Sequence, residues 1–285
     1  MNVQPLTPTI GAEICAVDCT EFNGSSISEL RELLNKHKVV VLRDQQLTLD
    51  GLEKFSALLG PLLRLPYIKS VDDYPDIIRV LKEADEINMG VFGGDWHSDF
   101  SFLTEPPSYS ILYAEEIPPL GGDTLWVNMT TALEQLPADL RETLTNRRLI
   151  HVGAPYGVKH APEQSTQFNG SIHIDRNNPE ADRETLHPAI VKHPDTGEFS
   201  LFLNPTYTTG IEGYDARQAR EILNRLFQFC TRPEFSFRLR WQSGNIVIWD
   251  NRTTMHYAVN DYDGYRRCMY RATISGNKPI APDID

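Results

Sequence analysis

Residues 235–250 read FSFRLRWQSGNIVIWD, two short β-like runs that are separated by a turn. Short runs of this kind, bounded by turn residues, are typical of strands in sandwiches and barrels. Further β-like runs follow one another along the chain at 76–82, 109–117, 123–129, 188–193, 199–204 and 270–275. We therefore expect a fold that is mainly β with helices, either a β-sandwich or a jelly-roll barrel.

Helical patterns decorate these runs. Residues 26–38, SISELRELLNKHK, carry apolar residues at helical spacing, and VVVLR (39–43) follows them as a candidate buried strand. The sequence predicts helices at 26–38, 48–60, 129–146 and 214–230. No internal repeat and no linker-like segment divides the chain, so we expect residues 1–285 to form a single domain.

The charge and the cysteines limit the classes of partner and compartment. A net charge of −12 argues against a general nucleic-acid or anionic-membrane surface, which would need a basic patch. No segment approaches the roughly 20 apolar residues of a membrane span, and the first residues lack the pattern of a signal peptide. The four cysteines lack metal-site spacing and are expected to be free thiols. We therefore expect a cytoplasmic protein.

The stretch WHSDFSF (96–102) raises the question of a metal site. His97 and Asp99 stand two apart, so on a strand their side chains would point to the same side. Such a pair also arises by chance, and it gains meaning from His256 in WDNRTTMHY (249–257). Two histidines and one carboxylate on a metal with open positions form the facial triad of non-haem Fe(II) oxygenases. These three residues are the predicted metal ligands and the catalytic centre.

Two arginines follow the second histidine. Arg267 and Arg271 are four residues apart, so on one strand they share a face. A buried arginine is costly unless it meets an anion. If the shared face is the interior, a dicarboxylate cosubstrate and an acidic substrate would supply two such anions. Phe100 and Tyr207 could line the pocket for the rest of the substrate.

Several separated segments resemble the taurine dioxygenase / phenoxyacetate (aryloxyalkanoate) dioxygenase family over nearly the whole chain. The resemblance implies a double-stranded β-helix, or jelly-roll, fold and dependence on Fe(II), 2-oxoglutarate and dioxygen. It implies that His97, Asp99 and His256 bind the iron and that Thr124 and Arg267 hold the distal carboxylate of 2-oxoglutarate. It further places Arg271 at the acidic group of the substrate. The segments that carry it are WHSDFSFLTEPP (96–107), GGDTLW (121–126), LHPAIVKHPDTG (186–197) and WDNRTTMHY with YRRCMYRATISGNKP (249–279).

The resemblance also bears on the substrate. Taurine-type members carry a substrate-binding histidine in the segment that corresponds to 60–75, and this chain has none there. We therefore expect a small organic acid, with aryloxyalkanoates ahead of short sulfonates. Residues 153–183 show no sustained period, and a stretch of that length is typical of a lid or binding loop. Relatives form dimers or higher oligomers, so a homo-oligomer is expected.

Two other functions use the same residues. A zinc-dependent hydrolase could activate water with this ligand set, but it needs a general base beside the metal, as in HExxH, and the sequence has none. A non-catalytic jelly-roll binding protein would not need an intact set of metal ligands. The oxygenase is therefore the leading hypothesis.

Overall fold

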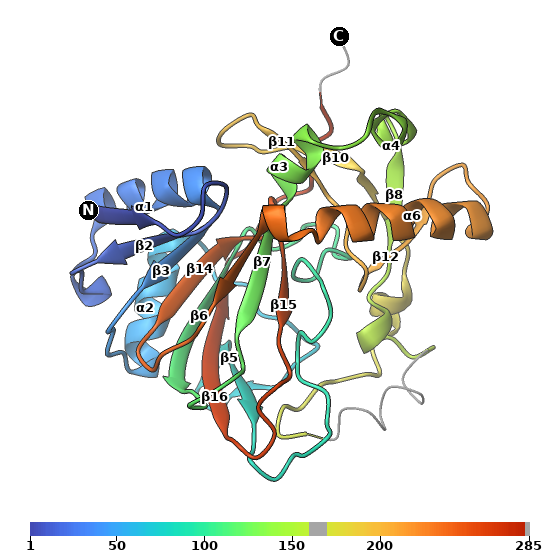
Figure 1. The fold of residues 1–285 in the computed structure, drawn as a ribbon. Helices are drawn as coiled ribbons and strands as arrows, with labels where there is room; N and C mark the ends of the chain where they lie inside the picture. The colour runs from blue at the N-terminus through green and yellow to red at the C-terminus, as the bar shows by residue number, and fades with distance from the viewer. Residues whose placement is uncertain (160–169, 283–285) are drawn as a thin grey trace.

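The computed structural model describes residues 1–159 and 170–282, and two β-sheets form its centre (Figure 1). The larger sheet has eight strands and the smaller one has three. The order in the larger sheet is β1 (Asn2–Pro5), β2 (Ala12–Cys15), β3 (Val39–Leu42), β14 (Ile246–Asp250), β6 (Tyr109–Glu116), β16 (Arg267–Thr273), β5 (Tyr74–Lys82) and β4 (Ser70–Val71). The order in the smaller sheet is β13 (Ser236–Leu239), β7 (Thr124–Asn128) and β15 (Thr254–Ala258).

Strand β14 shows why the two opening runs of the sequence belong to a layered β fold. All five of its residues are buried, because both faces of the larger sheet are covered. Val247 and Trp249 face the smaller sheet and share a core cluster with Trp126 of β7. Ile246 and Ile248 point the other way, into a cluster with the helices. Alternation with period two therefore gives β14 two apolar faces.

Two helices cover the outer face of the larger sheet, close to where they were predicted. Helix α1 spans Gly24–His37 and α2 spans Leu49–Leu59. Asn23 caps α1 and Thr48 caps α2, each by accepting backbone N–H groups of the first turn. Leucine and isoleucine side chains on the inner face of α1 pack against the sheet. This packing fixes the larger sheet and leaves its other face free to build the site.

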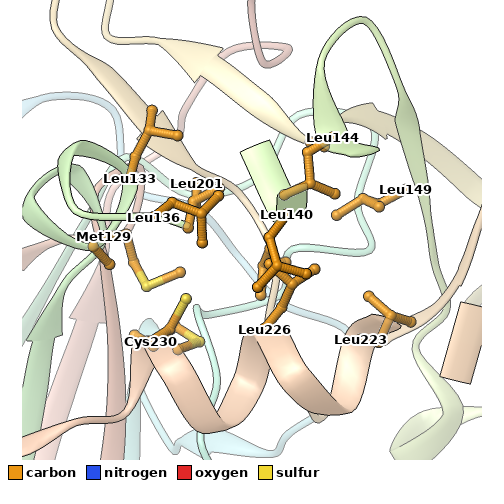
Figure 2. Close-up of a cluster of buried hydrophobic side chains, with 14 of the residues drawn as sticks. Met129, Leu133, Leu136, Leu140, Leu144, Leu149, Leu201, Leu223, Leu226 and Cys230 are labelled. Carbon is orange, nitrogen blue, oxygen red and sulfur yellow. The ribbon is translucent and has the colours of Figure 1, made fainter. Parts of the chain in front are cut away.

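A second helical layer covers the opposite end of the molecule. Helix α6 (Ala216–Cys230) lies across α3 (Met129–Glu134) and α4 (Ala138–Leu144), and leucine side chains fill the space between them (Figures 1 and 2). The predicted single helix at 129–146 is wrong, since the structure has two. Pro137 separates them, because proline has no N–H for the helix and its ψ of 140° is extended.

Other strands complete this end. A three-stranded sheet has the order β12 (Thr208–Ile211), β8 (Arg148–His151) and β9 (Thr185–Pro188). A hairpin pairs β10 (Ile190–Lys192) with β11 (Phe199–Leu201). The predicted strand at 188–193 is therefore divided, since β9 ends at Pro188 and β10 begins at Ile190. Strands β8, β12 and β15 were not predicted.

No helix in the described ranges is long and apolar enough to cross a membrane. All four cysteines are free, as the sequence predicted. The described parts of 153–183 are irregular apart from two short 3-10 turns, Ala154–Tyr156 and Pro179–Asp182, and an isolated bridge between Ile174 and Ile68. Residues 160–169 of the predicted lid lie outside the described residues.

Candidate metal centre and active site

His97, Asp99 and His256 meet in the interior of the molecule, and each is at most 7% exposed. The Nε2 atom of His97 is 3.5 Å from Asp99 Oδ1, and the Nε2 atom of His256 is 3.7 Å from the same oxygen. Two donors that each lie about 2.1 Å from one ion can be at most about 4.2 Å apart. Both nitrogen–oxygen pairs therefore have the spacing that a single metal ion requires.

The backbone holds the two histidines side by side. His256 lies on β15, and His97 forms an isolated bridge with it. His97 N–H donates to the carbonyl of His256 at 3.0 Å, and His256 N–H donates to the carbonyl of His97 at 2.7 Å. The imidazole of His97 also has its Nδ1 atom 2.7 Å from the carbonyl of Asp95. That contact fixes Nδ1 as the protonated nitrogen and leaves Nε2 as the metal-binding one.

The two oxygens of the Asp99 carboxylate have different partners. Its Oδ1 atom faces both histidines, whereas its Oδ2 atom accepts from Ser110 Oγ at 2.6 Å and from Arg271 Nη2 at 2.9 Å. Asn251 extends the network, because its Nδ2 donates to Ser110 Oγ and its Oδ1 accepts from Asp99 N–H. Asp99 is therefore oriented by neighbours that do not belong to the metal-binding set.

The charges of the site suit a cation. Burial alone would raise the pKa of Asp99, but Arg271 and the two imidazoles hold it well below its usual range. Burial and the adjacent His97 lower the pKa of His256 well below its ordinary value. The carboxylate is therefore ionised and His256 is neutral near pH 7. Those are the protonation states in which these side chains bind metal.

The structure changes one reason for the predicted pairing of His97 and Asp99. The sequence argument placed both on one strand, but Asp99 lies in a turn that follows the bridge residue. The turn directs the carboxylate to the same place, and Ser98 anchors it by donating to the carbonyl of Thr254 at 2.7 Å. The two ligands therefore converge through a bend in the chain, and strand alternation does not explain it.

The parity argument for the two arginines is confirmed. Arg267 and Arg271 lie on β16, are buried, and line one small cavity of about 40 Å³ together with His97 and His256. The tyrosine between them, Tyr270, packs toward the helices on the opposite face. From the sequence we expect a substrate to supply the anion for Arg271, but the structure already supplies one, because Arg271 forms the ion pair with Asp99 described above.

Arg267 is placed differently from Arg271. Its Nε is buried and has no hydrogen-bond partner among the described residues, and burial lowers its pKa. The rings of Trp241 and Tyr262 lie 5.8 and 5.9 Å from its guanidinium carbon. Gly122 has a φ of +69°, and a Cβ there would be 3.2 Å from Arg267 Cδ. The glycine in GGDTLW therefore lets the turn approach this arginine closely.

Thr124 lies beside Arg267 on the wall of the same small cavity. Its hydroxyl oxygen accepts a hydrogen bond from Trp241 Nε1 at 2.9 Å. Since a hydroxyl has one proton to donate, the Thr124 proton is available to an acceptor in the cavity. The small cavity thus combines a buried guanidinium and a hydroxyl donor next to the metal-binding triad.

A larger cavity of about 190 Å³ lies on the other side of His97 and Asp99. Tyr207 lines it, as predicted, and so does Tyr156, whose hydroxyl is 3.4 Å from that of Tyr207. Phe100 does not line either cavity. It is 1% exposed and its ring lies 5.4 Å from the guanidinium carbon of Arg271, so it supports that side chain from behind.

Sequence reasoning missed several residues of the site. Ser110 and Trp241 lie on or beside strands where they read as ordinary core residues. Tyr156 and Arg176 line the larger cavity, but they belong to the stretch without a sustained period. Asn251 accepts a hydrogen bond from Trp249 Nε1. It lies inside the motif WDNRTTMHY, and this position was the only indication in the sequence that it belongs to the site.

Comparisons with known proteins agree with this geometry. Residues 2–273 match the family described as "Taurine catabolism dioxygenase TauD, TfdA family". An alkylsulfatase of Acinetobacter baylyi is 33% identical over 97% of this chain and 85% of its own length. An alpha-ketoglutarate-dependent sulfate ester dioxygenase of Pseudomonas putida is 32% identical over 99% of this chain and 92% of its own length.

Solved structures give the same result for the fold. A putative alpha-ketoglutarate-dependent taurine dioxygenase from Burkholderia xenovorans superposes with a TM-score of 0.82 at 33% identity, covering all of this chain and 96% of its own. This likeness confirms the expected jelly-roll core. The metal-binding triad and the relatives also confirm the expected reaction class and its cofactors, iron, 2-oxoglutarate and dioxygen. The chain belongs to the TauD/TfdA family of taurine-catabolism-type dioxygenases.

Proposed function

We propose that this dioxygenase oxidises a C–H bond of a small organic acid, and that Arg267 and Thr124 hold the distal carboxylate of 2-oxoglutarate. The observation that carries the proposal is the buried Arg267 guanidinium, whose Nε has no partner among the described residues and which lies beside the Thr124 hydroxyl. A guanidinium fork fits a carboxylate in a bidentate manner. A dicarboxylate in the small cavity would satisfy that buried charge.

The chemistry depends on the residues that surround the metal position. His97, Asp99 and His256 would hold the ion and leave its other positions to the small molecules. When bound, iron, 2-oxoglutarate and dioxygen supply the oxidation of a C–H bond, and the protein supplies binding and orientation. Trp249, whose ring centroid lies 4.8 Å from that of His256, and the aromatic cluster around Tyr156 give the site apolar walls. The substrate carbon would enter from the larger cavity, next to His97 and Asp99.

The relatives point to the class of substrate. Two of the relatives named above are an alkylsulfatase and a sulfate ester dioxygenase, and a 2,4-dichlorophenoxyacetate dioxygenase is 30% identical. We propose a sulfate ester or an aryloxyalkanoate for this chain. Hydroxylation of the carbon that bears the ester oxygen would give a hemiacetal-type product. That product would break into an aldehyde and hydrogensulfate, or into a carbonyl compound and a phenol.

Arg271 remains a predicted contact of the substrate's acid group. Its Nη2 is committed to Asp99, and its Nε donates weakly to Thr273 Oγ1 at 3.3 Å. Its Nη1 makes no hydrogen bond within the described residues and is the part that could meet an anion. Tyr207, and Phe100 behind Arg271, are proposed to shape the space for the apolar body of the substrate.

A turnover screen tests the proposed function. Purified enzyme with Fe(II), ascorbate, dioxygen and 2-oxoglutarate would be given hexyl sulfate, phenoxyacetate, 2-phenoxypropionate or butanesulfonate, and succinate would be measured. Release of sulfate or phenol in proportion to succinate is expected for at least one acid. Succinate formation that none of these acids stimulates above the substrate-free rate would contradict the proposal.

Three broader expectations belong to the same proposal. We propose that the enzyme works in the cytoplasm as a homo-oligomer, without nucleic acid or membrane as a partner. The free cysteines support the compartment, and the net charge of −12 supports the absence of nucleic-acid and anionic-membrane partners. Light scattering at working concentration would test the oligomer, and a monomer at every concentration would contradict it.

A further inference from the structure

Among the described residues, the larger cavity is lined by one arginine and no lysine. Its described wall comes from the loop at 91–95, from the metal ligands, from Thr206 and Tyr207, and from the segment around Arg176. Among these lining residues Arg176 is the only lysine or arginine. Asp95, on the exposed rim, would repel an acidic group. Of the described lining residues, Arg176 is therefore the side chain whose charge attracts an anion, whereas Asp95 and Asp99 carry the opposite charge.

Arg271 cannot fill this place on its own. It lines the small cavity on the side of Arg267, and it does not line the larger one. Its Nη2 is 2.9 Å from Asp99 Oδ2, and both side chains are at most 3% exposed. Moving that guanidinium toward a substrate would leave the buried Asp99 oxygen with one partner fewer, which is costly. An acid group that lies in the larger cavity needs a further cation.

The structure positions Arg176 for this task. Its Nη1 donates to the carbonyl of Pro155 at 2.9 Å, and its side chain is half-buried. Asp175 N–H donates to the carbonyl of Tyr67 at 2.8 Å and Asn178 N–H donates to the carbonyl of Tyr156 at 3.2 Å, so the segment on both sides of the arginine is tied to the core. Partial burial lowers the pKa of Arg176, which means that the cation has lost water. A partly desolvated guanidinium in a fixed place binds an anion well.

Tyr156 connects this cation to the metal-binding end of the cavity. Burial raises the pKa of its hydroxyl to about 12, so the hydroxyl is protonated and can act as a hydrogen-bond donor in the cavity. It also lies 3.4 Å from the hydroxyl of Tyr207. Tyr156, Arg176 and Asp99 all line the larger cavity. A short substrate can place its acid at one end and its reacting carbon at the other.

We propose that Arg176 is a specificity-determining residue that binds the acid group of the substrate from the 153–183 stretch. This inference rests on the proposed function, and it names the residue that selects acids over neutral molecules. The ligand class is a small sulfate, sulfonate or carboxylate with an apolar body that fits between Tyr156 and Tyr207.

The matched pair Arg176→Gln and Arg183→Gln tests the proposal. Arg183 lies in the same stretch, is exposed and pairs with Glu180, so it controls for a change of charge without a change in the cavity. With the best acid of the screen, Arg176→Gln should raise KM roughly 10- to 100-fold, the value of a lost charge-assisted hydrogen bond. Arg183→Gln should leave KM within twofold, and both variants should keep the KM for 2-oxoglutarate.

A binding measurement keeps this test separate from turnover. Calorimetry on the Mn(II)-loaded protein with 2-oxoglutarate would measure the affinity for hexyl sulfate, phenoxyacetate and butanesulfonate. The uncharged 1-hexanol would serve as the neutral probe. We expect weaker binding of the acids to Arg176→Gln, partial rescue in Arg176→Lys and unchanged binding of 1-hexanol. Equal binding of the acids to wild type and Arg176→Gln would overturn the inference, as would a wild type that binds none of them. Failure of turnover with intact Arg176-dependent binding would instead contradict the proposed function alone.

Discussion

His97 and His256 are backbone partners as well as metal ligands. Each donates its N–H to the carbonyl of the other, at 3.0 and 2.7 Å, and their rings lie 4.0 Å apart between centroids. The pairing places the backbones of the two histidines directly side by side. The sheet therefore helps to bring the two imidazoles together at the metal position.

The first prediction concerns the metal. His97→Ala or Asp99→Ala removes one of three donors from a set in which each Nε2 already faces Asp99 Oδ1. Both variants should lose Fe(II)- or Mn(II)-binding measured by calorimetry, and their succinate formation should fall to background. His173→Ala, at an exposed histidine, is the control and should bind metal normally. Metal affinity like that of wild type in either ligand variant would show that the triad does not bind the ion.

The second prediction concerns 2-oxoglutarate. Arg267→Lys keeps a positive charge but loses the planar fork, so the KM for 2-oxoglutarate should rise roughly 10- to 100-fold. Thr124→Val should raise it less, because the hydroxyl contributes one neutral donor. Metal binding in the absence of 2-oxoglutarate should be unchanged in both. Arg266→Lys is the matched control, since Arg266 pairs with Glu83 outside the cavity. A KM that Arg267→Lys leaves unchanged would remove the assignment.

How far the sequence predicts this site depends on the kind of interaction. Two features of the site can be read from the sequence: the order of His97, Asp99 and His256, and the even spacing of the two arginines. Strand alternation correctly placed Arg267 and Arg271 on one face of β16. The helices and buried strands were predicted for the same reason, because apolar periodicity is local. Strand β15 was missed because TMHYA has no apolar alternation to reveal it.

The remainder depends on contacts between distant segments. The ion pair of Arg271 with Asp99 and the hydrogen bond from Trp241 to Thr124 join residues that are more than a hundred positions apart. No spacing rule connects such residues. The division into two cavities, with Arg176 in the larger one, likewise follows only from the packed structure. Local patterns therefore predicted the ligands of the metal more fully than the neighbours that orient them.

The third prediction concerns stability against pH. Burial, with a contribution from the nearby His187, lowers the pKa of His151 from 6.5 to about 3. Between these values the unfolded chain binds a proton at His151 and the folded protein does not, so stability is lost as the pH falls below about 6.5. One such group contributes about 1.4 kcal/mol per pH unit within that window.

Urea unfolding of the metal-free protein at several values between pH 4 and 6.5 would measure this slope. In His151→Gln the free energy of unfolding should depend less steeply on pH than in wild type. The difference in slope should correspond to about one bound proton. His173→Gln changes an exposed histidine and should keep the wild-type slope. The variant also loses the contact of His151 with Ser101, which changes the absolute stability. That change does not affect the test, because the prediction is about how the free energy of unfolding varies with pH. Identical slopes in wild type and His151→Gln would refute it.

The fourth prediction concerns the predicted lid at 153–183. In its described parts Gly153 N–H donates to Ala181 and Asp175 N–H donates to Tyr67. We expect these amides to exchange more slowly once 2-oxoglutarate and an acid substrate fill the cavity, because the bound acid then adds a contact to Arg176. Hydrogen exchange followed by mass spectrometry would measure this in the Mn(II)-loaded protein. Protection across the stretch that is already complete without ligand would contradict a lid.

The last prediction separates two tasks of Arg271. Ser110 and Arg271 both hold Asp99 Oδ2, so Ser110→Ala and Arg271→Ala should each weaken metal binding, by roughly 10- to 100-fold. If Arg271 also meets the acid group of the substrate, Arg271→Ala alone should raise the KM for the acid when metal is saturating. Wild type should then turn over the neutral ester of that acid poorly. Arg271→Ala should leave the KM for the ester unchanged. Metal titrations and KM values of the two variants, measured side by side, give the answer. Equal KM values would limit Arg271 to orienting Asp99, and unchanged metal affinity in both variants would show that Oδ2 needs neither partner.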